Sequence, residues 1–274
     1  MPAYICRTCG VQQAPSAGIP NHCSICADER QFVGREGQRW TTLEEMQGSY
    51  RTELTELEPD LYQITTEPTF GIGQRALLVR TSGGNLLWDC QSYLDQDTKA
   101  AVASLGGLSA IAISHPHFYG SCIEWSESFG GAPIYLSYRD RVFLVRSSPS
   151  VVHFEGDELE PWPGLRVLRL GGHFAGSTVL LWPAGAAGRG ALLTGDTIAV
   201  AADRRWTAFL YSFPNRIPLP PGAVQSIADR IADLPFDRIY GGWPEDDIKT
   251  DARGAVLRSA ERYLGMLDGS WPRG

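Results

Sequence analysis

The chain has 274 residues, of which 43% are hydrophobic and 20% are charged, and its formal net charge is −7. This length suits one large domain, or one domain with a small appendage. An acidic chain without a basic run is poorly suited to phosphate backbones, so a nucleic acid is disfavoured as a partner. No segment approaches the ~18 apolar residues of a membrane span, and the start lacks the apolar core of a signal peptide. We therefore expect a cytoplasmic protein with no membrane partner.

The chain begins with two Cys-x-x-Cys pairs that are separated by 13 residues, and their members are Cys6, Cys9, Cys23 and Cys26. Two thiolates two residues apart can hold one face of a tetrahedral ion, and a second pair closes it, so the spacing predicts a structural Zn²⁺ site. A redox dithiol or two disulfides are the alternatives. We predict a zinc-ribbon segment over residues 1–40 and a second domain over residues 41–274. The ribbon is expected to be structural, or to dock a protein partner or a second copy of the chain.

The second domain alternates short β-like runs with helical segments. A capping box at Thr42 to Glu45 predicts a short helix, and Ser82 to Asn85 predicts a hairpin turn. Strands are predicted at residues 50–54, 61–65, 75–80, 86–88, 110–113, 133–136, 165–170, 178–182, 191–193 and 238–240. Longer helices are predicted at residues 96–105, with Asp95 or Asp97 as the cap, and at residues 121–129, 222–234 and 250–267.

His115 and His117 form a His-x-His pair directly after the strand predicted at residues 110–113. At the end of a strand, positions i and i+2 point to the same side, so both imidazoles are expected to face one ion. His173 and Asp196 also follow predicted strands. Three imidazoles and one carboxylate are suitable ligands for Zn²⁺, Fe²⁺ or Mn²⁺. The sequence therefore predicts a second metal site.

The order of these motifs resembles the metallo-β-lactamase superfamily. Ser114 to His117 matches the first half of the family's His-x-His-x-Asp-His motif, Gly172 to Ser177 matches Gly-His-x-x-Gly-Ser, and Leu193 to Thr197 matches the Gly-Asp motif. Leu87 to Asp89 resembles an early motif whose aspartate supports the site without being a ligand. The resemblance covers about residues 50–245 and leaves the ribbon outside. It implies an α/β fold, the αββα sandwich, with the metal site at one edge of the paired sheets.

The chain departs from the family pattern where a second ion would bind. The Asp-His half of the first motif falls on Tyr119 and Gly120, and no histidine lies near Gly241 to Trp243, where the family has its last one. We therefore predict one ion at this site, Zn²⁺ with Fe²⁺ or Mn²⁺ as alternatives. The missing aspartate orients the attacking water in family hydrolases. Tyr119 is therefore a candidate catalytic residue beside Asp196, although it also suits a filler of the second ion's space.

Three functions remain open. The first is a mononuclear metal-dependent hydrolase whose small-molecule substrate is an ester, thioester or lactone. The second is a non-haem iron dioxygenase of the persulfide-dioxygenase type, which shares this fold and uses two histidines and one aspartate. The third is a non-catalytic metal-binding protein with a partner-docking ribbon. A nuclease is disfavoured by the charge and by the lost second ion. Cys90 and Cys122 suit small buried hydrophobic residues, with a thiol ligand or nucleophile as the alternative.

Overall fold

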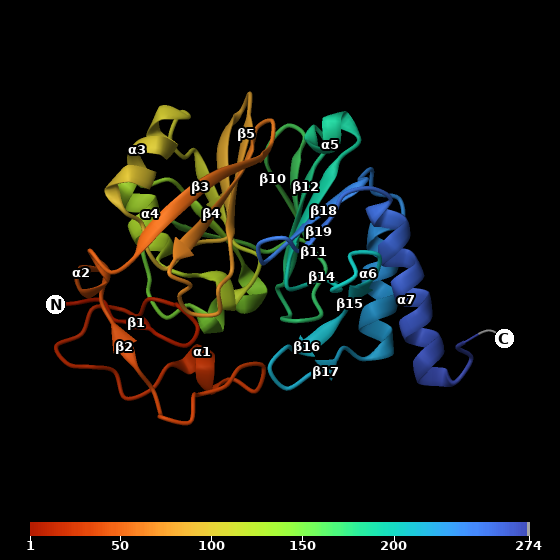
Figure 1. Cartoon of the computed structure of the whole chain (residues 1–274), viewed down its shortest axis with the longest axis horizontal. Coiled ribbons are helices and arrows are strands. Elements are labelled where there is room, and N and C mark those ends of the chain that lie inside the picture. The colour runs from red at the N-terminus through yellow and green to blue at the C-terminus, as the bar shows by residue number, and fades with distance from the viewer. Residues whose placement is uncertain (273–274) are drawn as a thin grey trace. The chain divides into compact units, whose positions relative to one another are not determined.

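A computed structural model describes residues 1–272 of the chain (Figure 1). Their contacts divide the chain into two compact units, Met1–Glu155 and Gly156–Gly274. The boundary that the sequence predicts between residues 40 and 41 lies inside the first unit and stays a prediction. Among the described helices, none has both the length and the apolar character that crossing a bilayer requires.

Residues 1–155 contain a sheet of seven strands, which are β3 (Arg51–Glu58), β4 (Leu61–Glu67), β5 (Ala76–Thr81), β6 (Gly84–Trp88), β7 (Ala110–Ala112), β8 (Ile134–Ser137) and β9 (Val151–Phe154). The spatial order of the strands follows the chain. The strands from β3 to β6 pair antiparallel, and those from β6 to β9 pair parallel. Parallel neighbours need crossover connections, and this requirement places helices between the later strands.

The helical segments of the first unit are α1 (Ser24–Ala27), α2 (Leu43–Met46), α3 (Gln96–Ser104), the 3-10 segment η1 (Pro116–Phe118), α4 (Cys122–Ser128) and the 3-10 segment η2 (Tyr138–Phe143). The predicted capping box is confirmed, because Thr42 and Glu45 exchange side-chain and backbone hydrogen bonds at the start of α2. Asp95 caps α3 by accepting a hydrogen bond from the amide of Thr98. The helix α4 packs against β7 and β8 and follows the loop that carries the His-x-His pair.

The N-terminal ribbon is tied together by a short antiparallel pair, β1 (Ile5–Cys6) and β2 (Trp40–Thr41). Ile5 is fully buried, and it packs in a small apolar cluster with Met46, Phe70 and Tyr93, which lie outside the ribbon. Such a short segment has little apolar core of its own. Its position therefore depends on this cluster and on the cysteine site described below.

The described part of the second unit, residues 156–272, contains a sheet of six strands, which are β10 (Glu158–Trp162), β11 (Leu165–Arg169), β12 (Thr178–Trp182), β13 (Ala191–Gly195), β18 (Arg238–Gly241) and β19 (Asp247–Ile248). All neighbours pair antiparallel except β13 and β18, which run parallel. The chain between them forms two small hairpins and a helix. These hairpins are β14 (Ala199–Val200) with β15 (Thr207–Ala208), and β16 (Leu210–Ser212) with β17 (Ile217–Pro218).

Two long helices, α6 (Pro221–Ile231) and α7 (Ala252–Asp268), lie side by side in the second unit (Figure 1). Their buried residues, among them Val224, Ile227 and Val256, share one apolar core with Leu181 and Leu192 of the sheet. The helices therefore cover one face of this sheet. A short segment with helical hydrogen bonds, α5 (Gly185–Gly188), connects β12 to β13.

Candidate metal centres

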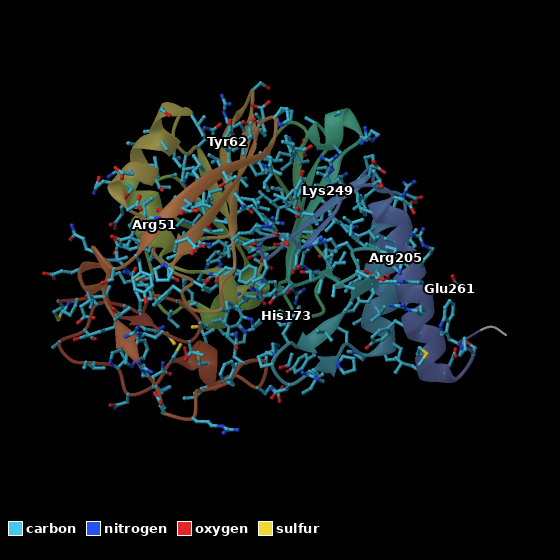
Figure 2. The ribbon with its side chains drawn as sticks, in the orientation of Figure 1. Arg51, Tyr62, His173, Arg205, Lys249 and Glu261 are labelled. Atoms are coloured by element: carbon cyan, nitrogen blue, oxygen red, sulfur yellow. The ribbon has the colours of Figure 1, made fainter. Side chains whose placement is uncertain are left out.

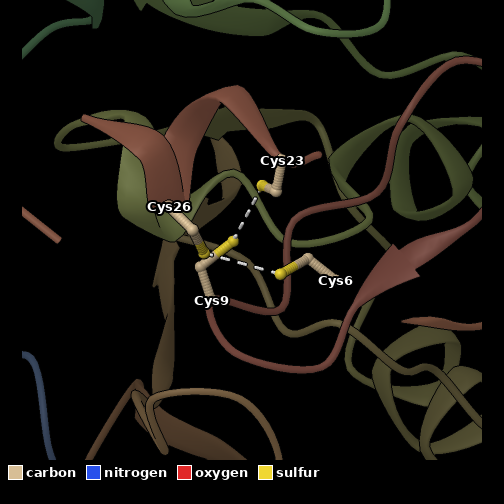
Figure 3. Close-up of side chains that lie close together, drawn as sticks. All are labelled: Cys6, Cys9, Cys23 and Cys26. Carbon is tan, nitrogen blue, oxygen red and sulfur yellow. Dashed lines mark hydrogen bonds between the residues drawn. The ribbon is translucent and has the colours of Figure 1, made fainter. Parts of the chain in front are cut away.

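Four cysteine side chains of the ribbon converge on one point, as Figure 3 shows. The Cys6 and Cys26 sulfurs lie 3.5 Å apart, and those of Cys9 and Cys23 lie 3.7 Å apart. In a tetrahedral zinc site with bonds of ~2.3 Å, the sulfurs are about 3.8 Å from one another, whereas a disulfide requires about 2.05 Å. All four cysteines are buried and none is in a disulfide. The geometry therefore fits the predicted tetrahedral metal site.

Hydrogen-bond donors surround the sulfur of Cys6. Gln38 Nε2 lies 3.0 Å from it, and the amide of Thr8 lies 3.4 Å from it. Hydrogen bonds from neighbouring thiols, that of Cys23 first, hold the pKa of Cys6 well below its ordinary value. Burial instead raises the pKa of Cys9. A metal ion would hold all four groups as thiolates, and the donors around Cys6 would then stabilise part of their negative charge.

His115 and His117 lie on the loop after β7. His115 has an extended backbone and caps η1, whereas His117 lies inside this 3-10 turn. Their rings meet edge to face, with centroids 5.1 Å apart. From the sequence we predicted that alternation along a strand points both imidazole rings to one side. This explanation is wrong. The strand ends at Ala112, and a tight turn that begins with Pro116 brings the rings together.

Asp89 and Ser114 hold this loop in place. Asp89 Oδ1 accepts a hydrogen bond of 2.7 Å from the amide of Ser114, whose hydroxyl lies 2.9 Å from Nδ1 of His115. Engagement of Nδ1 fixes the ring orientation and assigns Nε2 as the atom that His115 offers to a metal. Asp89 is not part of the group of candidate ligands. Its placement agrees with the supporting role that the family resemblance implies.

His173, labelled in Figure 2, follows β11, and Asp196 comes directly after β13. His173 Nε2 lies 3.5 Å from Asp196 Oδ2, and its Nδ1 lies 3.1 Å from the carbonyl oxygen of Leu210. A carbonyl accepts only, so Nδ1 of His173 carries a proton. The neutral ring with its proton on Nδ1 would offer Nε2 to a metal. Both side chains are buried, with 1% and 3% of their surface exposed.

The four predicted ligands form one group, since ligand atoms of His115, His117, His173 and Asp196 all lie within 4.8 Å of one another. Three imidazoles and one carboxylate in a buried cluster fit a divalent cation such as Zn²⁺, Fe²⁺ or Mn²⁺. Within residues 1–272, the side chains spaced for a metal ion form two groups, this one and the four cysteines. That the histidine group holds a single ion stays a prediction.

Tyr119, the candidate catalytic residue, lies next to the ribbon. It lines a small cavity together with Val11 and Leu144, and only 3% of its surface is exposed. Burial raises the pKa of its phenol well above the ordinary value, and Asp140 and Cys122 add to this. The hydroxyl therefore keeps its proton and is suited to donate a hydrogen bond rather than to act as a base. Its catalytic role stays a prediction.

Aromatic side chains occupy the region where the family pattern has its last histidine. The ring of Trp243 lies 5.7 Å from that of Phe213, and Phe213 meets His173 edge to face at 5.6 Å. Both aromatic residues are partly exposed. Phe213 therefore covers one edge of a candidate ligand, and Trp243 supports Phe213 from its other side.

The two groups that orient the imidazoles were not recognised from sequence. Ser114 adjoins His115, and a hydroxyl residue before a ligand histidine is a signal that could have indicated this role. The carbonyl of Leu210 leaves no sequence signal, because every residue has such a group and only the fold brings this one to His173.

No protein-family model matches the chain. It is 48% identical over 270 residues to a protein of Bacillus subtilis (strain 168) described as "Uncharacterized protein YmaE", and the match covers 98% of both chains. Among solved structures, the DIM-1 metallo-β-lactamase matches 77% of this chain and 97% of its own, with a TM-score of 0.56 and 15% identity. MEM-A1, a subclass B3 metallo-β-lactamase isolated from a soil metagenome library, matches 80% and 98%, with a TM-score of 0.52 and 18% identity.

The solved structures confirm the predicted fold, because they match most of this chain and nearly all of their own. At such low identity they show the fold alone. The match to YmaE is of another kind, since it extends over almost the whole of both chains and so includes the ribbon. The chain thus belongs to the same protein family as YmaE of Bacillus subtilis, and it has the fold of the metallo-β-lactamases with a cluster of four cysteines near its N-terminus.

Proposed function

We propose that the protein is a metal-dependent hydrolase that uses a single ion, held by His115, His117, His173 and Asp196, to cleave a small ester, thioester or lactone. The convergence of these four ligand atoms within 4.8 Å carries the proposal. The fold supports this proposal, because the solved structures that share it are metallo-β-lactamases, which are metal-dependent hydrolases. We further propose Zn²⁺ as the ion, because imidazole nitrogens and a carboxylate oxygen are ligands that zinc takes in catalytic sites.

Each side chain of the site has a distinct task. A bound ion would supply Lewis acidity, which polarises a carbonyl group of the substrate. The hydroxyl of Ser114 and the carbonyl of Leu210 contact Nδ1 of His115 and of His173, so each ring is oriented with Nε2 available to a metal. The carboxylate of Asp196 contributes the one negative charge of the ligand set and so balances part of the charge of a divalent ion.

The surroundings of His173 favour a substrate with an apolar acyl group. Phe213 presents a partly exposed ring at the edge of His173, and Trp243 packs behind it. Ligand sites combine such apolar walls with a few polar groups that fix orientation. An ester, thioester or lactone with an apolar acyl group suits this combination.

Elemental analysis and a substrate panel test this proposal together. The purified wild-type chain should contain two metal ions, one for each ligand group. His115→Ala should remove one of the two and lower the hydrolysis of responsive esters or thioesters by at least about 10³-fold, a loss of about 4 kcal/mol of transition-state stabilisation. His153→Ala is the matched control, because this histidine belongs to neither ligand group. It should keep both the ions and the activity.

Three results would contradict the proposal. One is a wild-type chain that holds two ions beyond the ribbon ion. Another is iron as the native metal together with oxygen uptake, which would indicate the dioxygenase alternative. The third is a fully loaded protein that hydrolyses no member of the panel at a rate sensitive to His115→Ala, which would indicate a non-catalytic site.

A further inference from the structure

The ribbon contacts the loop that carries the His-x-His pair. The backbone amide of Gln12 donates a hydrogen bond of 3.0 Å to the carbonyl of Gly120, the residue that closes this loop. Gln12 also bridges to Ile5, next to the first ribbon cysteine. Gln12, which lies three positions after Cys9, therefore binds the backbone of Gly120, which lies three positions after His117.

The side chain of Gln12 adds a second connection. Its Nε2 donates to Glu124 of α4 at 3.3 Å, and its Oε1 accepts a hydrogen bond from Arg146. Arg146 also binds Glu124 at 2.7 Å, so the three side chains form a closed network. Only 4% of the Gln12 surface is exposed. Hydrogen bonds to charged groups in such a setting are stronger than the average bond and leave the amide little freedom.

Gly120 is packed so closely that a side chain would not fit at this position. Its φ is +51°, and a Cβ atom at this position would lie 2.6 Å from the carbonyl oxygen of Gln91. The same carbonyl accepts a hydrogen bond from the amide of Ser121, and the amide of Cys90 donates to the carbonyl of Phe118. The loop is therefore held between residues 90–91 on one side and the ribbon on the other.

The metal end of the ribbon is equally close-packed. The amide of Gly10 donates to the carbonyl of Cys6 at 2.8 Å and closes the turn between the first two cysteines. A Cβ atom on Gly10 would lie 2.3 Å from the hydroxyl of Ser92, and one on Gly71 would lie 3.1 Å from the amide of Gly10. The cysteine turn thus packs directly on the same chain segment, residues 90–92, that supports the histidine loop.

We propose that Gln12 is a positioning residue for the histidine metal site, through which the metal-loaded ribbon fixes the loop from His115 to Gly120. An ion at the four cysteines holds the turn after Cys6, this turn places Gln12, and Gln12 places Gly120. The inference rests on the proposed function only in treating the histidine group as an ion site. It gives the ribbon a task within the first unit, beside any docking of a partner.

Metal affinity tests the inference without the need for a substrate. The full-length apo-protein is titrated with Co²⁺, whose cobalt–thiolate charge-transfer absorption reports the cysteine site alone, and a competing chelator then measures the affinity of the second ion. Gln12→Ala should leave the thiolate signal unchanged and weaken the second ion at least about tenfold, at the lower end of the effect of residues that orient metal ligands. Gln12→Asn, which keeps both an amide donor for Glu124 and an acceptor for Arg146 on a shorter side chain, should recover part of the loss.

Gln31→Ala is the matched control, because this ribbon glutamine is similarly buried, at 7% exposed, and its backbone bonds to Asp28 inside the ribbon. It should bind both ions as the wild type does. If Gln31→Ala weakened the second ion as much as Gln12→Ala does, the effect would come from general damage to the ribbon, and the inference would be overturned. Unchanged affinity in Gln12→Ala would overturn it as well and leave the proposed function intact. A wild-type chain that binds no second Co²⁺ would overturn both.

Discussion

His115 and His173 are both oriented through Nδ1, one by the hydroxyl of Ser114 and the other by the carbonyl of Leu210. Each orienting group fixes the ring and assigns Nε2 to the metal. A hydroxyl can donate or accept, whereas a carbonyl can only accept. The carbonyl of Leu210 therefore keeps a proton on Nδ1 of His173 and leaves Nε2 as the nitrogen that can bind a metal. His115 has a partner that adapts to either tautomer, so its orientation depends more on the backbone that Asp89 fixes.

Phe213 packs against a candidate ligand, and under the proposed function this position gives its ring a part in substrate selection. We expect Phe213→Ala to raise KM about tenfold for esters with long apolar acyl chains and to change kcat by less than about threefold. Burial of such a ring contributes about 1.5–3 kcal/mol, and 1.4 kcal/mol corresponds to a factor of ten in binding. Steady-state kinetics with a series of acyl chains measures this. Phe32→Ala, which removes an exposed ribbon ring, is the control. An equal change in KM for acetate esters and for long-chain esters would contradict the expected role.

The sequence could indicate candidate ligands, because they follow apolar runs, chemistry limits the residue types that bind metals, and the motif order resembles a known family; that they bind an ion stays a prediction. The residues that position these candidate ligands could not be predicted. Gln12 looks like an ordinary polar residue of a loop, and its bonds to Glu124 and Arg146 join positions 112 and 134 residues apart. Contacts of this kind follow from the fold and leave no local pattern.

Helix starts show which elements local sequence can determine. The capping residues Thr42 and Asp95 were found because a cap satisfies backbone amides within four residues. The strands β1, β2, β9, β10, β14 to β17 and β19 were not predicted. Several have only two residues, and β10 contains Glu158, Glu160 and Pro161, so neither alternation nor β propensity marks them. Which strands they pair with depends on the tertiary fold and not on their own composition.

Asp95 connects the cap of α3 to the first strand of the sheet, and this makes the helix sensitive to acid. Its carboxylate accepts hydrogen bonds from the amides of Thr98, at 2.8 Å, and Thr52, at 2.6 Å. Partial burial raises the pKa of Asp95, but these bonds outweigh it and bring the pKa below the ordinary value. The resulting stabilisation is fully present above the unfolded-state pKa of about 3.9, and it is lost as the pH falls through the lower folded-state pKa.

We expect Asp95→Ala to lower the free energy of unfolding by about 1–2 kcal/mol at neutral pH, the usual loss for an N-cap, and by less near pH 3. Urea unfolding at several pH values measures the difference. Asp97→Ala, in the first turn of the same helix, is the control, since Asp97 is not the cap. A deficit for Asp95→Ala that stayed constant from pH 7 to pH 3 would show that the charge of the carboxylate is not involved.

Over the whole molecule, the order of short motifs predicted the fold better than composition or periodicity did. The order of the motifs resembles that of the metallo-β-lactamase superfamily, and the fold was predicted from this resemblance. The ribbon lies outside the part of the chain that this resemblance covers. Its four cysteines predicted a metal site, but its contact with the histidine loop depends on backbone groups and on Gly10 and Gly120, whose φ values of +81° and +51° do not follow from their identity alone.

The ribbon ion should stabilise more than the ribbon, because Ile5 and Gln12 attach this segment to the rest of the first unit. We expect Cys9→Ala to lose one metal ion and to lower Tm by on the order of 10 °C, since the binding energy of a structural ion contributes to folding. Cys122→Ala is the matched control. Burial raises the pKa of Cys122 to about 12, so it remains a neutral thiol, and it belongs to neither ligand group. Calorimetry with parallel metal analysis distinguishes the two variants. Equal melting temperatures with unequal metal content would mean that the ion stabilises the ribbon alone, and the ribbon could not then hold the histidine loop in place.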